Sequence, residues 1–101
     1  MDTKSLINEA KARFSHNAAK SLLKDKYESK LIVADQGGLW KATPELIGFL
    51  SININENVVL IDNHNNPVLV NRIQLYNTLH KIYTDTMNLW LTEWKELETK
   101  R

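Results

Sequence analysis

The segment from Arg72 to about Thr99 contains no glycine and no proline, and its apolar residues recur every three or four positions. This repeat predicts one long amphipathic helix. Asn71, immediately before it, is of a residue type that caps helix starts. The main apolar row follows a spacing close to a coiled-coil seam and comprises Tyr76, Leu79, Tyr83, Met87, Trp90, Trp94 and Leu97.

A second apolar row is displaced around the same helix. It comprises Leu75, Ile82 and Leu89, and Leu91 adds apolar surface near the tryptophans. Each large apolar side chain left in water costs about 1.5 to 3 kcal/mol relative to its buried state. We therefore expect these rows to be covered, either by the first helix of the same chain or by another chain.

The first helix is predicted from Thr3 to about Ser29, because Ile7, Ala10, Phe14, Ala18 and Leu22 recur at the helical period without a glycine or proline between them. Asp2 or Thr3 can cap its start. At a rise of about 1.5 Å per residue, both terminal helices are roughly 40 Å long, whereas strands of this size span about 17 to 20 Å. The helices must therefore extend beyond any sheet.

Two β-hairpins are predicted between the long helices. Residues 31–34 and 39–42 form the first, around Gly37 and Gly38, which supply the positive φ of a tight turn. Residues 58–61 and 68–70 form the second, around the turn-forming run 62–67. Thr43 and Pro44 mark the start of a short helix that ends near Asn53.

The predicted order is α-β-β-α-β-β-α, which is an α+β fold. The two hairpins could join into one four-stranded antiparallel sheet with the helices packed on one face. The 101 residues, of which 43% are hydrophobic and 25% charged, fit a single globular domain over residues 1–101.

We find no catalytic, metal or cofactor motif. Cysteine is absent, and His16, His64 and His80 lack metal-site spacing. Asp62, His64 and Asn66 alternate like the start of a calcium loop, but Pro67 and Ile73 stand where that loop needs a glycine and a bidentate acid. The sequence therefore favours a protein that is not an enzyme and takes no cofactor or small-molecule substrate. A small hydrolase or transferase whose site forms only in an oligomer is the remaining enzymatic alternative.

The net charge of +1 does not by itself indicate an anionic partner, although the first thirty residues are mildly basic. The start of the chain lacks a secretion signal and no stretch has the length of a membrane span, so we expect the cytoplasm and no membrane partner.

Three segments of the sequence are similar to those of a known group of proteins. They are residues 5–14, residues 38–42, and residues 59–62 together with 66–72. In this order they resemble the small uncharacterised proteins of T-even-type tailed phages, particularly those that infect cyanobacteria. The resemblance implies a phage context, in which a product of this size is a virion component or an adaptor for host or phage machinery.

The leading functional prediction is a non-enzymatic protein–protein interaction module, acting as a virion or assembly component or an adaptor, that binds a partner or a second copy of itself. Its predicted contact residues are Leu75, Ile82, Leu89, Trp90, Leu91 and Trp94. The alternative is a nucleic-acid-associated or transcription-regulating factor. The basic residues that this alternative requires are Lys11, Arg13, Lys20, Lys24, Lys41 and Arg72.

Overall fold

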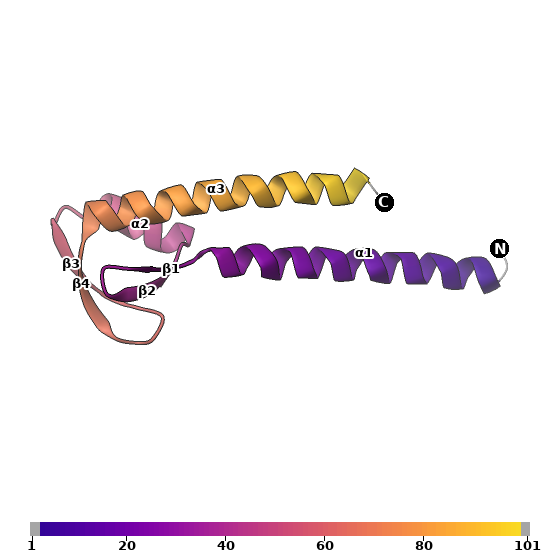
Figure 1. Cartoon of the computed structure of the whole chain (residues 1–101), viewed down its shortest axis with the longest axis horizontal. Helices are drawn as coiled ribbons and strands as arrows, with labels where there is room; N and C mark the ends of the chain where they lie inside the picture. The colour runs from indigo at the N-terminus through magenta and orange to yellow at the C-terminus, as the bar shows by residue number, and fades with distance from the viewer. Residues whose placement is uncertain (1–2, 100–101) are drawn as a thin grey trace.

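A computed structural model describes residues 3–99 and shows an α+β fold with three helices and two antiparallel hairpins (Figure 1). The order α-β-β-α-β-β-α is confirmed, with each predicted boundary met within one or two residues. The elements are α1 (Thr3–Lys30), β1 (Ile32–Asp35), β2 (Gly38–Lys41), α2 (Pro44–Ile52), β3 (Asn57–Ile61), β4 (Pro67–Asn71) and α3 (Arg72–Thr99).

The molecule has a head and an arm. Helices α1 and α3 run side by side and antiparallel to form the arm, and the hairpins and α2 form the head at one end (Figure 1). The extents are 66 × 25 × 19 Å and the radius of gyration is 19.4 Å. A compact domain of this length has a radius of gyration of about 13 Å. The prediction that the long helices extend beyond the strands is therefore confirmed.

The structure contains the helix caps predicted at Thr43 and Asn71. Thr43 Oγ1 accepts a hydrogen bond from the Leu46 amide at 3.2 Å, and Asn71 Oδ1 accepts one from the Gln74 amide at 3.0 Å, so both are N-caps. In the first helix, Thr3 is itself helical, and Asp2 lies outside the described residues. No helix within residues 3–99 combines the length and the apolar character needed to cross a membrane.

The turn of the first hairpin is the two-residue loop Gln36–Gly37, and both residues have positive φ, at 49° and 80°. Gly38 was expected to serve the same turn, but it does not have a positive φ. Its lack of a side chain serves another purpose: a Cβ at Gly38 would lie 2.5 Å from the Trp40 ring. Gly38 is therefore the position where the indole packs against the backbone.

The two hairpins do not join into the four-stranded sheet considered above; they form two separate two-stranded sheets. Side chains link them instead. Asp62 is buried and accepts hydrogen bonds from the amides of Leu39, His64 and Asn66. The backbone hydrogen bond from Asn63 to Leu39, at 2.8 Å, adds one direct contact. The calcium-like spacing around Asp62 is thus explained by a turn that docks one hairpin on the other.

Gln36 makes a second link between the hairpins. Its side-chain amide donates to the Asn71 carbonyl at 3.2 Å and accepts from the Asn71 amide at 2.7 Å. The side chain thereby satisfies both backbone groups of Asn71, as a neighbouring strand would. Four hydrogen bonds, three through the side chains of Asp62 and Gln36 and one between the backbones of Asn63 and Leu39, thus link the hairpins in place of the ladder of a continuous sheet.

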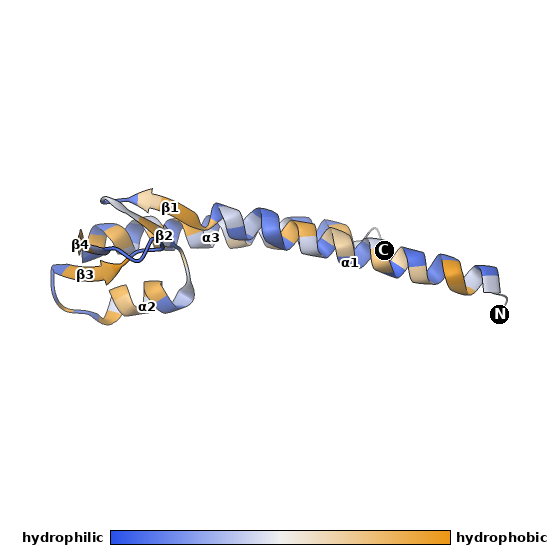
Figure 2. Cartoon of the chain, turned by 90° about the horizontal axis from the view of Figure 1, so that it is seen from below, coloured by the Kyte–Doolittle hydropathy of each residue, from blue (hydrophilic) through white to orange (hydrophobic). Residues whose placement is uncertain are grey.

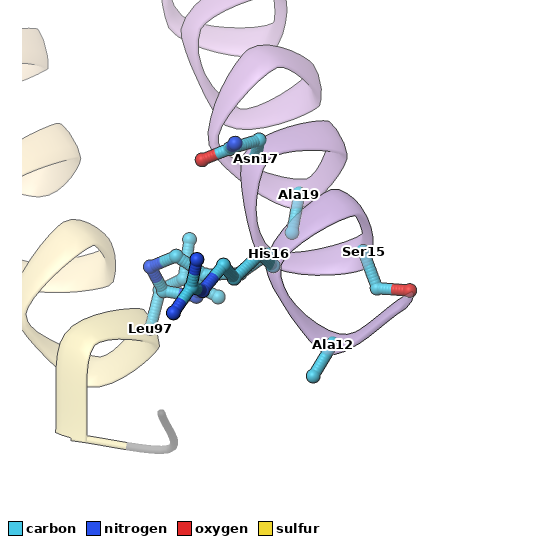
Figure 3. A pocket seen from close by; sticks show the side chains of 7 residues that line it. Ala12, Ser15, His16, Asn17, Ala19 and Leu97 are labelled. Atoms are coloured by element: carbon cyan, nitrogen blue, oxygen red, sulfur yellow. The ribbon is translucent and has the colours of Figure 1, made fainter. Parts of the chain in front are cut away.

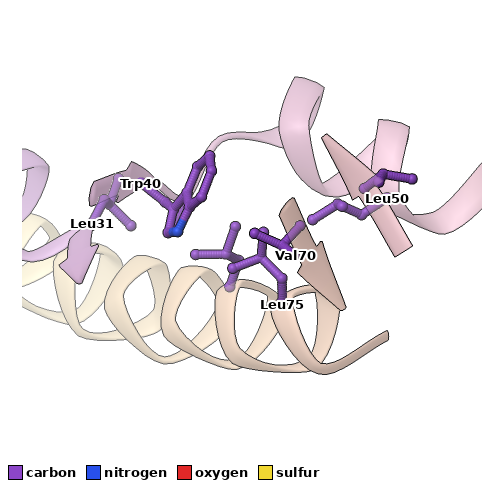
Figure 4. Packing of buried hydrophobic residues seen from close by; sticks show 8 residues of the cluster. Leu31, Trp40, Leu50, Val70 and Leu75 are labelled. Atoms are coloured by element: carbon purple, nitrogen blue, oxygen red, sulfur yellow. The ribbon is translucent and has the colours of Figure 1, made fainter. Parts of the chain in front are cut away.

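The hydrophobic core lies in the head, between the hairpins, α2 and the first turns of α3 (Figure 4). Its buried members are Leu31, Trp40, Ala42, Leu50, Val58, Val70, Leu75 and Leu79. Trp40 is 2% exposed, and its indole N–H donates to the Asp35 carbonyl at 2.8 Å. Such burial suits cross-strand packing and leaves no face on which a nucleic-acid base could stack.

Candidate protein-binding surface

The arm is held together by an aromatic and ionic cluster near the head. The rings of Tyr27 and Trp90 stack with their centroids 6.2 Å apart and their planes 8° from parallel. Glu93 accepts hydrogen bonds from the Tyr27 hydroxyl at 2.5 Å and from Lys26 Nζ at 2.8 and 3.1 Å. Lys30 Nζ lies 5.0 Å from the centre of the Tyr27 ring, which adds a cation–π contact. These contacts fix α1 against α3 in an antiparallel register.

The same cluster shifts three pKa values. The hydrogen bond from Lys26, followed by that from Tyr27, lowers the pKa of Glu93. The bond to Glu93 in turn raises the pKa of Lys26 and that of Tyr27. The charged carboxylate and ammonium are therefore the favoured forms, which is the behaviour of a structural ion pair.

A second ionic contact lies near the free end of the arm. Glu98 lies 2.7 Å from Lys20 Nζ and 3.2 Å from His16 Nε2, and these two contacts, Lys20 first, lower its pKa. An open hollow lies beside it, lined by His16, Leu97 and the neighbouring turn of α1 (Figure 3). The imidazole of His16 that lines this hollow is the same one that contacts Glu98.

A shallow apolar depression lies on one flank of the arm. It is lined by Met87, Trp90, Leu91 and Trp94, which we call the tryptophan patch. Leu91 is 49% and Trp94 40% exposed. Lys20 Nζ lies 5.6 Å from the centre of the Trp94 ring and supplies a basic edge. Large aromatic and methionine side chains bordered by charge are typical of protein-binding surfaces.

The six predicted contact residues do not form one surface. Trp90, Leu91 and Trp94 share the tryptophan patch. Leu89 is 55% exposed, but it lies two residues from Leu91, about 200° around the helix, and so on the other side of α3. Met87, which completes the patch, was assigned by its spacing to the main apolar row and was not among the six.

The remaining two predicted contacts belong to the head. Ile82 is half-buried and packs against the core. Leu75 is 0% exposed, so including it in a contact surface was wrong. The first turns of α3 are covered by the head because β4 runs directly into them, and Leu75 faces the core there.

Helix α1 carries an apolar row that faces away from α3. We call Ile7, Ala10, Phe14, Ala18 and Leu22 the outer row; all five are exposed. This is the same repeat that predicted the helix, so the periodicity was correct although the row is not covered by α3. Figure 2 shows apolar residues continuing along α1 towards its N-terminal end.

The six basic residues of the nucleic-acid alternative are dispersed. Arg72 is committed to the head, since its guanidinium donates to the carbonyls of Leu50 and Asn55, each at 2.8 Å. Lys20 pairs with Glu98, and Lys24 lies 3.8 Å from Glu28. Lys41 is half-buried on β2, whereas Lys11 and Arg13 lie near the tip of the arm. They do not make a continuous basic stripe of the kind that follows a phosphate backbone.

The histidines lie in separate places. His16 contacts Glu98, His80 stacks on Tyr76 at 5.4 Å, and His64 belongs to the turn around Asp62. Within residues 3–99, no cluster of three or more histidine, aspartate or glutamate side chains is arranged to hold a metal ion.

No protein-family model matches the sequence, and the searches of curated proteins and of solved structures found no significant match.

Proposed function

We propose that the chain is a non-enzymatic interaction module that binds a protein partner through the tryptophan patch. The observation that carries the proposal is the clustering of Met87, Trp90, Leu91 and Trp94 around one shallow apolar depression on the arm. Tryptophan side chains contribute disproportionately to binding energy when a partner excludes water from them. Methionine adapts its shape to the surface that it meets.

The electrostatics of the arm support a partner with an acidic edge. Lys20 borders the patch at Trp94 and, although paired with Glu98, is about one third exposed. Helix α1 contributes seven basic and three acidic residues in all. A partner that presents an apolar anchor with carboxylates beside it would therefore complement both the patch and its border.

The phage resemblance supports a setting for this activity. A small virion or assembly component, or an adaptor for host or phage machinery, requires a contact surface and no catalytic centre. We keep the cytoplasm of the producing cell as the proposed compartment.

In the first step of the test, a photo-crosslinking amino acid replaces Leu91 in the full chain. The protein that becomes cross-linked to this position on irradiation is then identified. Binding of that protein, once purified, is then measured by calorimetry for the Trp94→Ala and Leu91→Glu variants. Both should bind at least roughly 30-fold more weakly, as expected for a central aromatic contact. Leu89→Glu is the matched control, because it changes an exposed leucine on the other side of α3, and it should leave the affinity within about twofold.

Equal losses for Leu89→Glu and Leu91→Glu would contradict the proposal. A capture that nuclease treatment or moderate salt abolishes would instead favour the nucleic-acid alternative, because phosphate contacts weaken steeply with ionic strength.

A further inference from the structure

The outer row lies on the side of α1 opposite to α3. Tyr27, Leu23 and His16 line the contact with α3, and Ala18, Phe14 and Ile7 each precede one of them by nine residues. Nine residues are about two and a half helical turns, so each member of the outer row points away from its counterpart. One face of α1 is thus occupied by α3. The opposite face is open and mostly apolar, with Lys11 as a charged residue within it.

This open face includes the most exposed aromatic side chain of the arm. Phe14 is 76%, Leu22 70% and Ile7 48% exposed. In addition, the first part of α1 extends past the end of α3, and every described residue up to Ser15 is exposed (Figure 1). A helix segment that packs on nothing has little tertiary stabilisation, so a neighbour along this tip would stabilise it.

We infer that a second copy of the chain covers the outer row, with the two α1 helices packed antiparallel about a twofold axis near Phe14. A twofold interface must be self-complementary: if residue i contacts residue j, then j contacts i. The outer row satisfies this condition because it reads nearly the same in both directions. Alanines lie four residues on either side of Phe14, and Ile7 and Leu22 lie seven and eight residues away.

The sizes of these side chains suit such a seam. Reversing one helix brings Ile7 opposite Leu22 of the second copy and sets the two Phe14 rings together at the centre. Ala10 and Ala18 leave room on either side for the opposing rings. Alternation of large and small residues is what allows two helical surfaces to interdigitate.

The charges select the antiparallel orientation. Lys4 precedes Ile7 by three residues and Asp25 follows Leu22 by three, and both lie on the face of the outer row. In the antiparallel register, Lys4 of each copy lies opposite Asp25 of the other, at both ends of the seam. A parallel register would instead oppose Lys4 to Lys4, Lys11 to Lys11 and Asp25 to Asp25. Within residues 3–99 neither Lys4 nor Asp25 forms an ion pair, so both are available.

This inference uses a surface other than the tryptophan patch and does not depend on the proposed function. In the pair, each α1 would lie between its own α3 and the second α1, giving a layer of four helices. The tryptophan patches would stay on the flanks of the layer, where they remain open to a different protein.

Sedimentation equilibrium of the full chain over a wide concentration range is the first measurement. The wild type should form a dimer, and Phe14→Glu and Leu22→Glu should each weaken it by about 100-fold or more, since each change places two charges in an apolar seam. Leu91→Glu is the matched control and should leave the dimer unchanged. Circular dichroism serves as the folding control for each variant. A wild-type chain that stays monomeric, or a dimer lost with Leu91→Glu and kept with Phe14→Glu, would overturn the inference.

Charge reversal tests the orientation. The Lys4→Glu chain and the Asp25→Lys chain should each dimerise about tenfold more weakly alone at low ionic strength, because like charges then face each other at both ends. Mixed together they should pair as tightly as the wild type, since each reversed charge meets an opposite one. A parallel seam predicts a different pattern, because like charges already face each other at both ends of its wild-type pair. Each variant alone would then dimerise about as tightly as the wild type, and the mixture would pair more tightly than the wild type; that result would refute the antiparallel arrangement.

The absence of cysteine allows an independent check. Ser15→Cys lies near the proposed axis and should form a disulfide between copies on mild oxidation. Ser29→Cys is the control: in the antiparallel register the two introduced thiols lie about 40 Å apart along the seam, so they should stay reduced. Equal cross-linking at both positions would contradict the register.

Discussion

Replacing Leu75 and Leu89 by alanine in separate variants tests whether α3 is buried in the head at one end and open to solvent in the arm. Leu75 is 0% exposed in the core and Leu89 is 55% exposed on the arm, although both belong to the same apolar row. Each substitution removes three carbon atoms, equivalent to about 2.4 kcal/mol of transfer free energy if the side chain is fully buried. The cavity left at Leu75 raises its destabilisation to roughly 3 to 4 kcal/mol.

Because the Leu89 side chain is about half exposed, replacing it by alanine loses at most about half of this transfer free energy. The substitution also leaves no enclosed cavity, so it should destabilise the chain by about 1 kcal/mol or less. In a chain of about 100 residues, 3 kcal/mol corresponds to a fall of roughly 12 to 24 °C in melting temperature. The head should therefore melt far earlier in Leu75→Ala than in Leu89→Ala.

Urea unfolding followed by circular dichroism measures both free energies. All samples are compared at one protein concentration, because association would add a concentration-dependent contribution to the free energy of unfolding. Equal destabilisation of the two variants would refute the division of α3 into a buried head segment and an open arm segment.

Three further predictions concern the head. Gly38→Ala should destabilise it by about 1 to 3 kcal/mol in thermal melts, because a Cβ would lie 2.5 Å from the Trp40 ring. The three backbone amides, that of Asn66 first, lower the pKa of Asp62. The charged Asp62 carboxylate should therefore contribute its full stabilisation above the pKa that Asp62 has in the unfolded chain, and this contribution should be lost as the pH falls through its pKa in the folded chain. On acid titration, the free energy of unfolding of Asp62→Asn should fall less steeply than that of the wild type. Gln36→Ala should raise amide hydrogen exchange at Asn71, and unchanged protection there would contradict the link between the hairpins.

The order and bounds of the elements could be predicted because their signals are local. Thr43 with Pro44, and Asn71 before the long apolar repeat, set helix starts through caps that the structure contains. The positive φ at Gly37 likewise depends only on neighbouring residues. Such features need no knowledge of the rest of the chain.

The placement of surfaces could not be predicted in the same way. Helical periodicity identifies residues that share a face, but it does not say which face meets another element. The repeat that contains Phe14 was therefore found correctly and yet lies in solvent. Leu75 and Leu89 share one row but differ in burial, because the head ends between them. The separation of the two sheets depends on Asp62 and Gln36, whose long-range hydrogen bonds have no signature in the sequence.

The junctions between arm and head have a mechanical consequence. Only Leu31 separates α1 from β1, and no residue separates β4 from α3. Because no flexible linker intervenes at either junction, a force applied to the paired part of α1 and α3 should act as a torque on the hairpins. The direction of the arm should therefore be set by the packing of the head, and a change in the hairpins should reorient both long helices together.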